Sequence, residues 1–173
     1  MLKTNQIYKD LIELIKVALK SQGLNWQVIQ TYQQSMGNLQ PPFVMLHRLT
    51  ASNFGFQYGK DINDKHTENQ IEILKFQIEA YKPRSTRDKV DTITATDVVR
   101  LVAMYFMSDE GIEKIREKGY NVLRITEVVE EYYKEVNDIY QVNPHFKMDL
   151  VTLNSIESTA NKIGGIVNTI KKI

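Results

Sequence analysis

The sequence contains no cysteine and only three histidines among its 173 residues. Without cysteine, the chain has no disulfide, no thiolate nucleophile and no cysteine-ligated zinc or iron–sulfur site. His47, His66 and His145 lie far apart in the sequence and form neither an HExxH motif nor any other metal-ligand spacing. We therefore expect a structural role for His47, no metal site and no cofactor.

The sequence also lacks the glycine motifs of the common enzyme classes. Its eight glycines are scattered, and no GxSxG, phosphate-binding loop or GxGxxG occurs. The carboxylate pair Glu130-Glu131 lies in a highly charged stretch, whereas a general acid needs burial to raise its pKa. We expect a non-enzymatic protein. Because catalytic groups can converge from distant positions, a small enzyme with a dispersed site stays open as an alternative.

Long hydrophobic runs and an excess of charge of one sign are absent as well. The central apolar run from Leu101 to Met107 is far shorter than the ~18 residues of a membrane span. Twenty-two basic residues balance 21 acidic ones, so no global field attracts DNA or an anionic membrane. Charged residues near the N-terminus exclude a signal-peptide core. We expect a soluble, cytoplasmically made protein that binds no membrane, with a small DNA-binding module as a weaker alternative.

Apolar residues at helical spacing predict helices in four places. The first covers residues 5–22, and the second begins at Thr94, where Asp97 provides a capping-box spacing. A short third helix follows from Ser108 to Gly119, with acids in its first turn. Residues 156–173 also have helical spacing, although two central glycines weaken that helix.

Five segments have the composition or the alternation of β-strands. They are Trp26–Tyr32, Phe43–Thr50, Ile71–Tyr81, Val122–Thr126 and residues 145–153. The second has apolar groups on both faces and should be a central strand, whereas the third alternates apolar with polar residues and should have one wetter face.

The order of these elements predicts the fold class. Helices do not alternate regularly with strands, so we expect an α+β fold with a mixed or antiparallel sheet. An N-terminal helix and a central helix pair should pack on that sheet. The length suits a single domain over residues 1–155, followed by a C-terminal arm or helix over 156–173.

Two charged segments are candidate subunit interfaces. Residues 82–89 are basic, and they form either a solvated turn or a surface for an acidic partner. Residues 127–135 are acidic, and a wet surface is their simplest interpretation. The interface candidates are Lys82, Arg84, Arg87 and Lys89 in the first segment and Glu127, Glu130, Glu131 and Glu135 in the second.

Two further segments are candidate arms. Residues 51–69 are rich in glycine, asparagine and aromatic residues, which predicts a long loop or a protruding hairpin. Its aromatic residues either bind a partner or fold onto their own domain. The arm candidates are Phe54, Phe56 and Tyr58 in this segment and Ile163, Val167 and Ile170 in the C-terminal stretch.

The layout of residues 5–155 resembles the tail terminator (neck) family of tailed bacteriophages. The run from Gln40 to Leu46, QPPFVML, is similar to that family's entry into a strand. The strand from Glu72 to Tyr81 resembles its alternating strand that ends in alanine or glycine and tyrosine. A helix beginning TATDVV and a final strand from Phe146 to Leu153 follow in the same order.

This resemblance implies a structural virion protein. Tail terminators are α+β proteins that form a hexameric ring, stop tube polymerisation and join the tail to the head connector, and they provide no catalytic residues to transfer. The implied partners are further copies of the chain, the tail tube protein and a head-completion or connector protein, with a sheath protein as a possible further partner. DNA would only pass through the channel. The implied location is the virion neck, after assembly in the host cytoplasm; a head-closure or connector protein is the alternative.

Overall fold

The computed structural model of the protein describes most of the chain. The described residues are 4–31, 40–62, 65–83, 92–134 and 140–159, and a few strand residues among them are described by their backbone alone. They form one six-stranded sheet with three helices. None of the helices in this part of the chain is long and apolar enough to cross a membrane.

The three helices are α1 (Thr4–Ser21), α2 (Ala95–Met107) and α3 (Asp109–Glu117). The predicted capping box is confirmed, because Thr94 Oγ1 accepts a hydrogen bond from the Asp97 amide and the Asp97 carboxylate accepts one from the Thr94 amide. Ser108 ends α2 and caps α3, since its hydroxyl accepts from the Gly111 amide. Local capping chemistry therefore fixes the corner between the two central helices.

The strands confirm the predicted α+β fold with a mixed sheet. Their order is β1-β2-β3-β6-β4, and β5 also pairs with β6. Strands β1 and β2 are parallel, and the other pairs are antiparallel. The strands are β1 (Gln27–Gln30), β2 (Phe43–Ile62), β3 (Lys65–Tyr81), β4 (Asn121–Ile125), β5 (Val129–Lys134) and β6 (Tyr140–Thr159).

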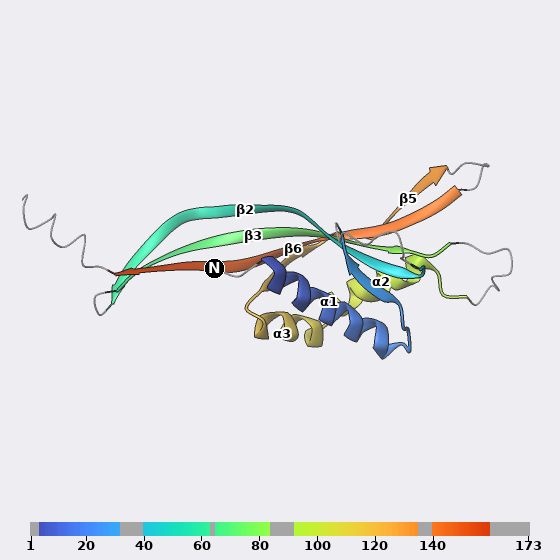
Figure 1. The fold of residues 1–173 in the computed structure, drawn as a ribbon, viewed down its shortest axis with the longest axis horizontal. Helices are drawn as coiled ribbons and strands as arrows, with labels where there is room; N and C mark the ends of the chain where they lie inside the picture. Colours follow the sequence, from blue (N-terminus) through green and yellow to red (C-terminus); the bar gives the residue numbers. More distant parts are fainter. Residues whose placement is uncertain (1–3, 32–39, 63–64, 84–91, 135–139, 160–173) are drawn as a thin grey trace, which may run out of the picture.

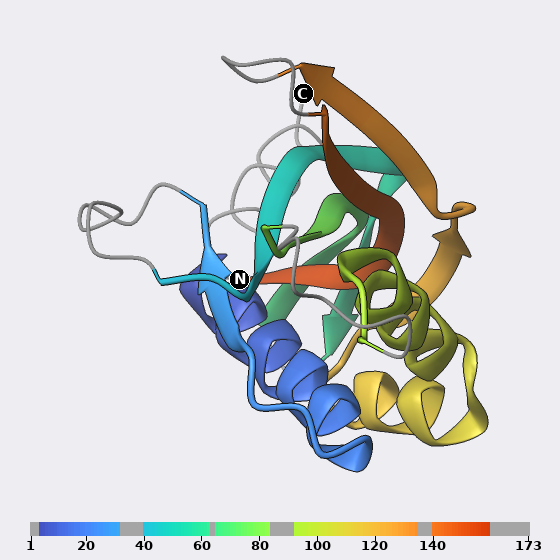
Figure 2. The ribbon, with the colours of Figure 1, turned by 90° about the vertical axis from the view of Figure 1, so that its right-hand side faces the viewer.

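The hydrophobic core lies between the helices and one face of the sheet. Leu74, Phe76 and Ile78 of β3 point into it and are buried, as are their β6 neighbours Phe146 and Met148. Figure 1 shows the helices gathered beneath one part of the sheet, and Figure 2 shows the curved sheet above them from one end. The residues that alternate with these core positions lie on the opposite, outer face of the sheet.

Three strands are much longer than the sequence predicted. β2 has 20 residues, β3 has 17 and β6 has 20, whereas a typical strand has roughly 5–6. Together, residues 54–62, 65–71 and 153–159 form an extension, here named the blade, that continues beyond the helices (Figure 1). Of the two structures predicted for residues 51–69, the protruding hairpin is confirmed for the described residues.

The C-terminal helix predicted from Ile156 is wrong for its first four residues. Residues Ile156 to Thr159 belong to β6, because they pair with Glu68 to Lys65 of β3. Backbone pairing with a neighbouring strand outweighs the local helical spacing there. Residues 160–173 lie outside the described part of the chain. The division of the chain at residue 155 stays a prediction.

Candidate interaction surfaces

The acidic segment forms an exposed strand at one end of the sheet. β5 pairs with the first residues of β6, and Figure 1 shows both at the end of the molecule opposite the blade. Glu127, Glu130 and Glu131 are exposed. The Glu130 carboxylate accepts a hydrogen bond from the Tyr132 hydroxyl at 2.9 Å. Glu127, Glu130 and Glu131 therefore form a solvated surface. Glu135 lies outside the described residues. An interface role for them stays a prediction.

The basic segment leaves the sheet at the same end. β3 ends at Tyr81, beyond the paired residues Glu79 and His145, and β5 begins opposite His145. Lys82 Nζ donates a hydrogen bond to the Ile93 carbonyl, just before α2, at 2.8 Å. Arg84, Arg87 and Lys89 lie outside the described residues. The structure thus places Lys82, the first residue of the basic segment, and the acidic strand at one end of the sheet.

The candidate arm over residues 51–69 is the hairpin of the blade. Phe54 pairs with Ile71 on β3, and its side chain is 63% exposed. The strand register shifts between Phe54 and Tyr58, and Gly55 takes a φ of 77° there, a conformation that favours glycine. The sequence left two possibilities for these aromatic residues, which were binding a partner or folding onto their own domain. The exposure of Phe54 shows that its side chain does not pack on the core. The side chains of Phe56 and Tyr58, and all of Ile163, Val167 and Ile170, lie outside the described residues.

His47 takes part in a hydrogen-bond network on the outer face of the sheet. Its Nε2 lies 2.6 Å from Glu79 Oε1, and its Nδ1 contacts the Thr31 hydroxyl. Glu79 Oε2 also accepts hydrogen bonds from Gln77 and from Asn143, at 3.2 and 3.3 Å. Burial raises the pKa of Glu79, but these hydrogen bonds and the charge of His47 outweigh it and lower the pKa below the ordinary value of 4.5.

The network gives a prediction for stability in acid. Because the pKa of Glu79 is lower in the folded chain, its contribution is present above the unfolded value of 4.5 and is lost as pH falls through the folded value. We expect the free energy of unfolding to fall over this range less steeply in Glu79→Gln than in the unaltered chain. Urea titrations between neutral pH and pH ~3 measure the difference. Identical slopes for the two proteins would contradict it.

The network does not have the geometry that would favour an enzyme. An enzyme site at His47 would need a pocket and two carboxylates, but in the described residues His47 meets one, Glu79. No group of three histidine or carboxylate residues among the described positions could hold a metal ion. The contacts of the network join Thr31, which directly follows β1, to β2, β3 and β6.

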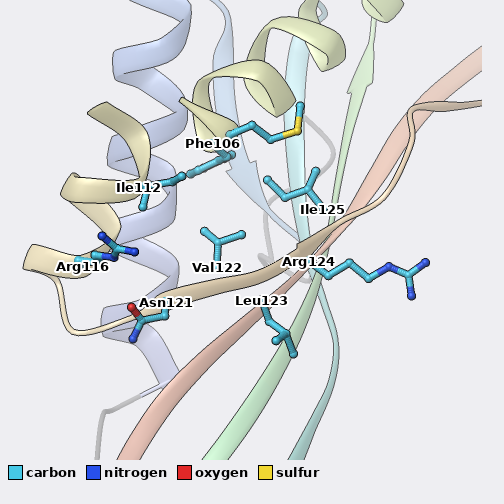
Figure 3. Close-up of a pocket in the computed structure, with 9 residues that line it drawn as sticks. Phe106, Ile112, Arg116, Asn121, Val122, Leu123, Arg124 and Ile125 are labelled. Carbon is cyan, nitrogen blue, oxygen red and sulfur yellow. The ribbon is translucent and has the colours of Figure 1, made fainter. Parts of the chain in front are cut away.

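A pocket of about 300 Å³ lies elsewhere, between β4 and the corner of α2 and α3 (Figure 3). Phe106, Ile112, Val122 and Ile125 give it an apolar lining, and Arg116 lies at its edge. No histidine or carboxylate lines it, so it presents no acid–base pair. Leu123 and Arg124 of β4 also line it, but in Figure 3 their side chains point away from Phe106 and Ile112.

A comparison with protein families assigns the chain to a family. The family model described as E217 gateway protein gp29 matches residues 6–162, which is most of the chain and includes all three helices except the start of α1. The chain belongs to this gateway protein family. No curated protein matches the chain.

The gateway family match supports the coarser part of the sequence resemblance. It places the chain in a phage neck protein family. It does not assign the chain to the tail terminators specifically. It also extends past residue 155, where the sequence resemblance ended, to residue 162. The blade therefore lies entirely inside the part of the chain that matches the gateway family.

Proposed function

We propose that this chain is a non-enzymatic structural protein of the phage neck that assembles into a ring at the joint between head and tail. The match to the gateway family over residues 6–162 carries this proposal. The His47 network and the pocket at β4 support the non-enzymatic part, because within the described part of the chain neither brings together a histidine and two carboxylates.

The finer proposal is a hexameric ring at the head-proximal end of the tail, which stops tube polymerisation and joins the tail to the head connector. Its partners would be neighbouring copies, the tail tube protein and a head-completion or connector protein. A sheath protein is a further possible partner, and DNA would pass through the channel. The alternative within the neck is a head-closure or connector protein.

The shape of the subunit suits such an assembly. A ring needs head-to-tail contacts in which two different patches of each subunit meet. The acidic strand β5 and Lys82, the first residue of the basic segment, lie at one end of the sheet, and the blade extends from the other end (Figure 1). Charge contacts between neighbours at the first end would set the register of the ring, while the blade would reach a subunit or ring farther away.

Reversing the charges of Arg84 and Arg87 to glutamate should weaken ring assembly. In this proposal the two arginines face the acidic strand of a neighbour, so the double variant places like charges together. Sedimentation velocity and electron microscopy at low and moderate salt measure the fraction of rings, or of chain bound to tube ends.

A matched control changes the same amount of charge elsewhere. Lys16 and Lys20 are exposed on α1 and belong to neither charged segment, and their double glutamate variant should assemble like the unaltered chain. If the Arg84 and Arg87 variant forms rings with unchanged yield and unchanged salt sensitivity, the charged segments do not form the contact.

A further inference from the structure

The strand β4 lies at an edge of the sheet, where it pairs with β6. Within the described residues, no strand pairs with its other edge. Just after β4, the Thr126 amide donates a hydrogen bond to the Lys147 carbonyl at 2.9 Å. Because backbone groups alternate in direction along an antiparallel pair, the amide and the carbonyl of Ile125 point away from β6. Such an edge is a template for one further strand.

The core is open along the same edge. Val122 and Ile125 face the helix side of the sheet, because they pair with the buried Leu150 and Met148 of β6. Both are nevertheless only half-buried, and both line the pocket of about 300 Å³ at this edge. Figure 3 shows their side chains on the side of β4 that faces Phe106. The pocket therefore lies where the next strand of the sheet would place its inward side chains.

Exposed apolar side chains surround this opening. Met107, at the end of α2, is 55% exposed, and Leu123 of β4 is 58% exposed. Both line the pocket. Apolar surface gathered beside a pocket marks a binding site more often than a free surface does, and the flexible side chain of methionine adapts to the shape of a partner.

The charges at this edge favour an acidic partner. Arg116 and Arg124 line the pocket, whereas no carboxylate does. Neither arginine forms an ion pair within the described part of the chain. Arg124 lies opposite Asp149 of β6, and Lys75 of β3 lies opposite Asp149 from the other side. This outer row therefore holds two cations and one carboxylate, and its outermost member is the cation Arg124.

We propose that the free edge of β4 binds an extended segment of a partner protein in which apolar residues alternate with acidic ones. Successive side chains of a strand point to opposite faces. One set would enter the apolar pocket, and the other would lie beside Arg124 on the outer face, where opposite charges on neighbouring strands attract. The backbone of the segment would pair with the outward groups of β4, as in other cases of strand addition.

A second copy of the chain fits this site less well. The acidic edge strand of the described sheet is β5, but its residues Glu130 and Glu131 are adjacent and so point to opposite faces. A neighbour's β5 would therefore direct one carboxylate into the apolar pocket. The proposed site does not depend on the ring contacts proposed above.

A short labelled peptide in which valine alternates with glutamate is the probe, and fluorescence anisotropy measures its binding to the full chain. We expect saturable binding, weakened about tenfold or more when lysine replaces glutamate in the peptide. Arg124→Glu should weaken binding of the glutamate peptide by a similar factor. Lys16→Glu is the matched control, because it changes the same charge at an exposed position of α1 that does not line the pocket. It should leave the affinity unchanged.

Two further measurements separate strand addition from charge attraction alone. Val122→Phe fills the pocket with an aromatic side chain suited to a strand, and it should weaken binding while circular dichroism verifies the fold. Hydrogen exchange followed by nuclear magnetic resonance should show the outward amide of Ile125 becoming protected when the peptide binds.

Three results would overturn the proposal, namely no saturable binding, equal affinity for the glutamate and lysine peptides, or bound peptide with no protection of the Ile125 amide. Protection of that amide without peptide, rising with the concentration of the chain, would also overturn it, because a second copy would then occupy the edge.

Discussion

Replacing Asp10 by alanine is expected to lower the free energy of unfolding by about 3 kcal/mol. Asp10 is only 7% exposed although it lies on the apolar face of α1. Its Oδ2 accepts a hydrogen bond from the Tyr120 hydroxyl at 3.0 Å, and its Oδ1 accepts one from Gln6 at 2.9 Å. Lys118 Nζ lies 3.5 Å from Oδ1. Alanine would leave the hydroxyl of the buried Tyr120 without this partner.

The cluster of Asp10, Lys118 and Tyr120 joins distant parts of the chain, which explains the size of the expected loss of stability. It joins α1 to the turn between α3 and β4, more than a hundred residues later in the sequence. Equilibrium urea unfolding measures the change. Glu13→Ala is the control, because Glu13 contacts the same Lys118 at 2.8 Å but its side chain is 66% exposed. The control should change stability by less than about 1 kcal/mol; equal effects of the two substitutions would show that burial of Asp10 does not matter.

The same cluster predicts a response to alkaline pH. Burial, and then the hydrogen bond to Asp10, raises the pKa of Tyr120 well above its ordinary value of 10.0. The raised pKa adds stability that is fully present below the unfolded value and is lost as pH rises through the folded value. Tyr120→Phe should therefore lose less stability than the unaltered chain when the pH rises above that of an ordinary tyrosine.

Replacing Gly111 by alanine should lower the free energy of unfolding by about 3 kcal/mol, in spite of alanine's higher helix propensity. Gly111 lies in the first turn of α3, where α3 packs directly against the end of α2. A Cβ at this position would overlap the Tyr105 carbonyl and crowd the Phe106 Cα. These are backbone atoms, so the two helices would have to move apart.

Thermal and urea unfolding of Gly111→Ala measure this effect. Glu113→Ala, an exposed position of the same helix, should change stability by no more than about 0.5 kcal/mol. A Gly111→Ala protein as stable as the unaltered chain would mean that the corner between α2 and α3 tolerates a wider separation than the structure indicates.

Features that depend on neighbouring residues were predictable from the sequence. The start of α2 was predicted because Thr94 and Asp97 are three residues apart and bond to each other's backbone. The strand Ile71–Tyr81 was predicted because apolar and polar residues alternate along it, which indicates one buried and one wetter face. The predicted α+β fold followed from the order of such local signals.

Features that depend on long-range pairing were not predictable in the same way. The extension of β2 through Asn53, Gly55 and Gly59 goes against local strand preference. It forms because β3 supplies a partner along its length, and β6 in turn pairs with β3. The same pairing places Ile156 in a strand although its spacing is helical.

The two polar networks had only weak signals in the sequence. Asp10 lies between Ile7, Leu11 and Leu14 on the buried face of α1, so an acidic residue there indicates a buried partner without naming it. His47 was predicted to be structural, but its partner Glu79 belongs to another strand. Ile71 and Ile73 occupy the polar phase of the alternation that continues to Tyr81, so they indicate apolar residues on the outer face of β3.

The most direct test of the neck assignment is the position of this chain in an assembled phage. Purified virions that carry an epitope tag on this protein can be labelled with gold-conjugated antibody and imaged by electron microscopy. We predict gold at the joint between head and tail, in particles that have kept their tails. Gold along the tail, on the capsid surface or at the baseplate, or virions that lack the protein, would contradict the account.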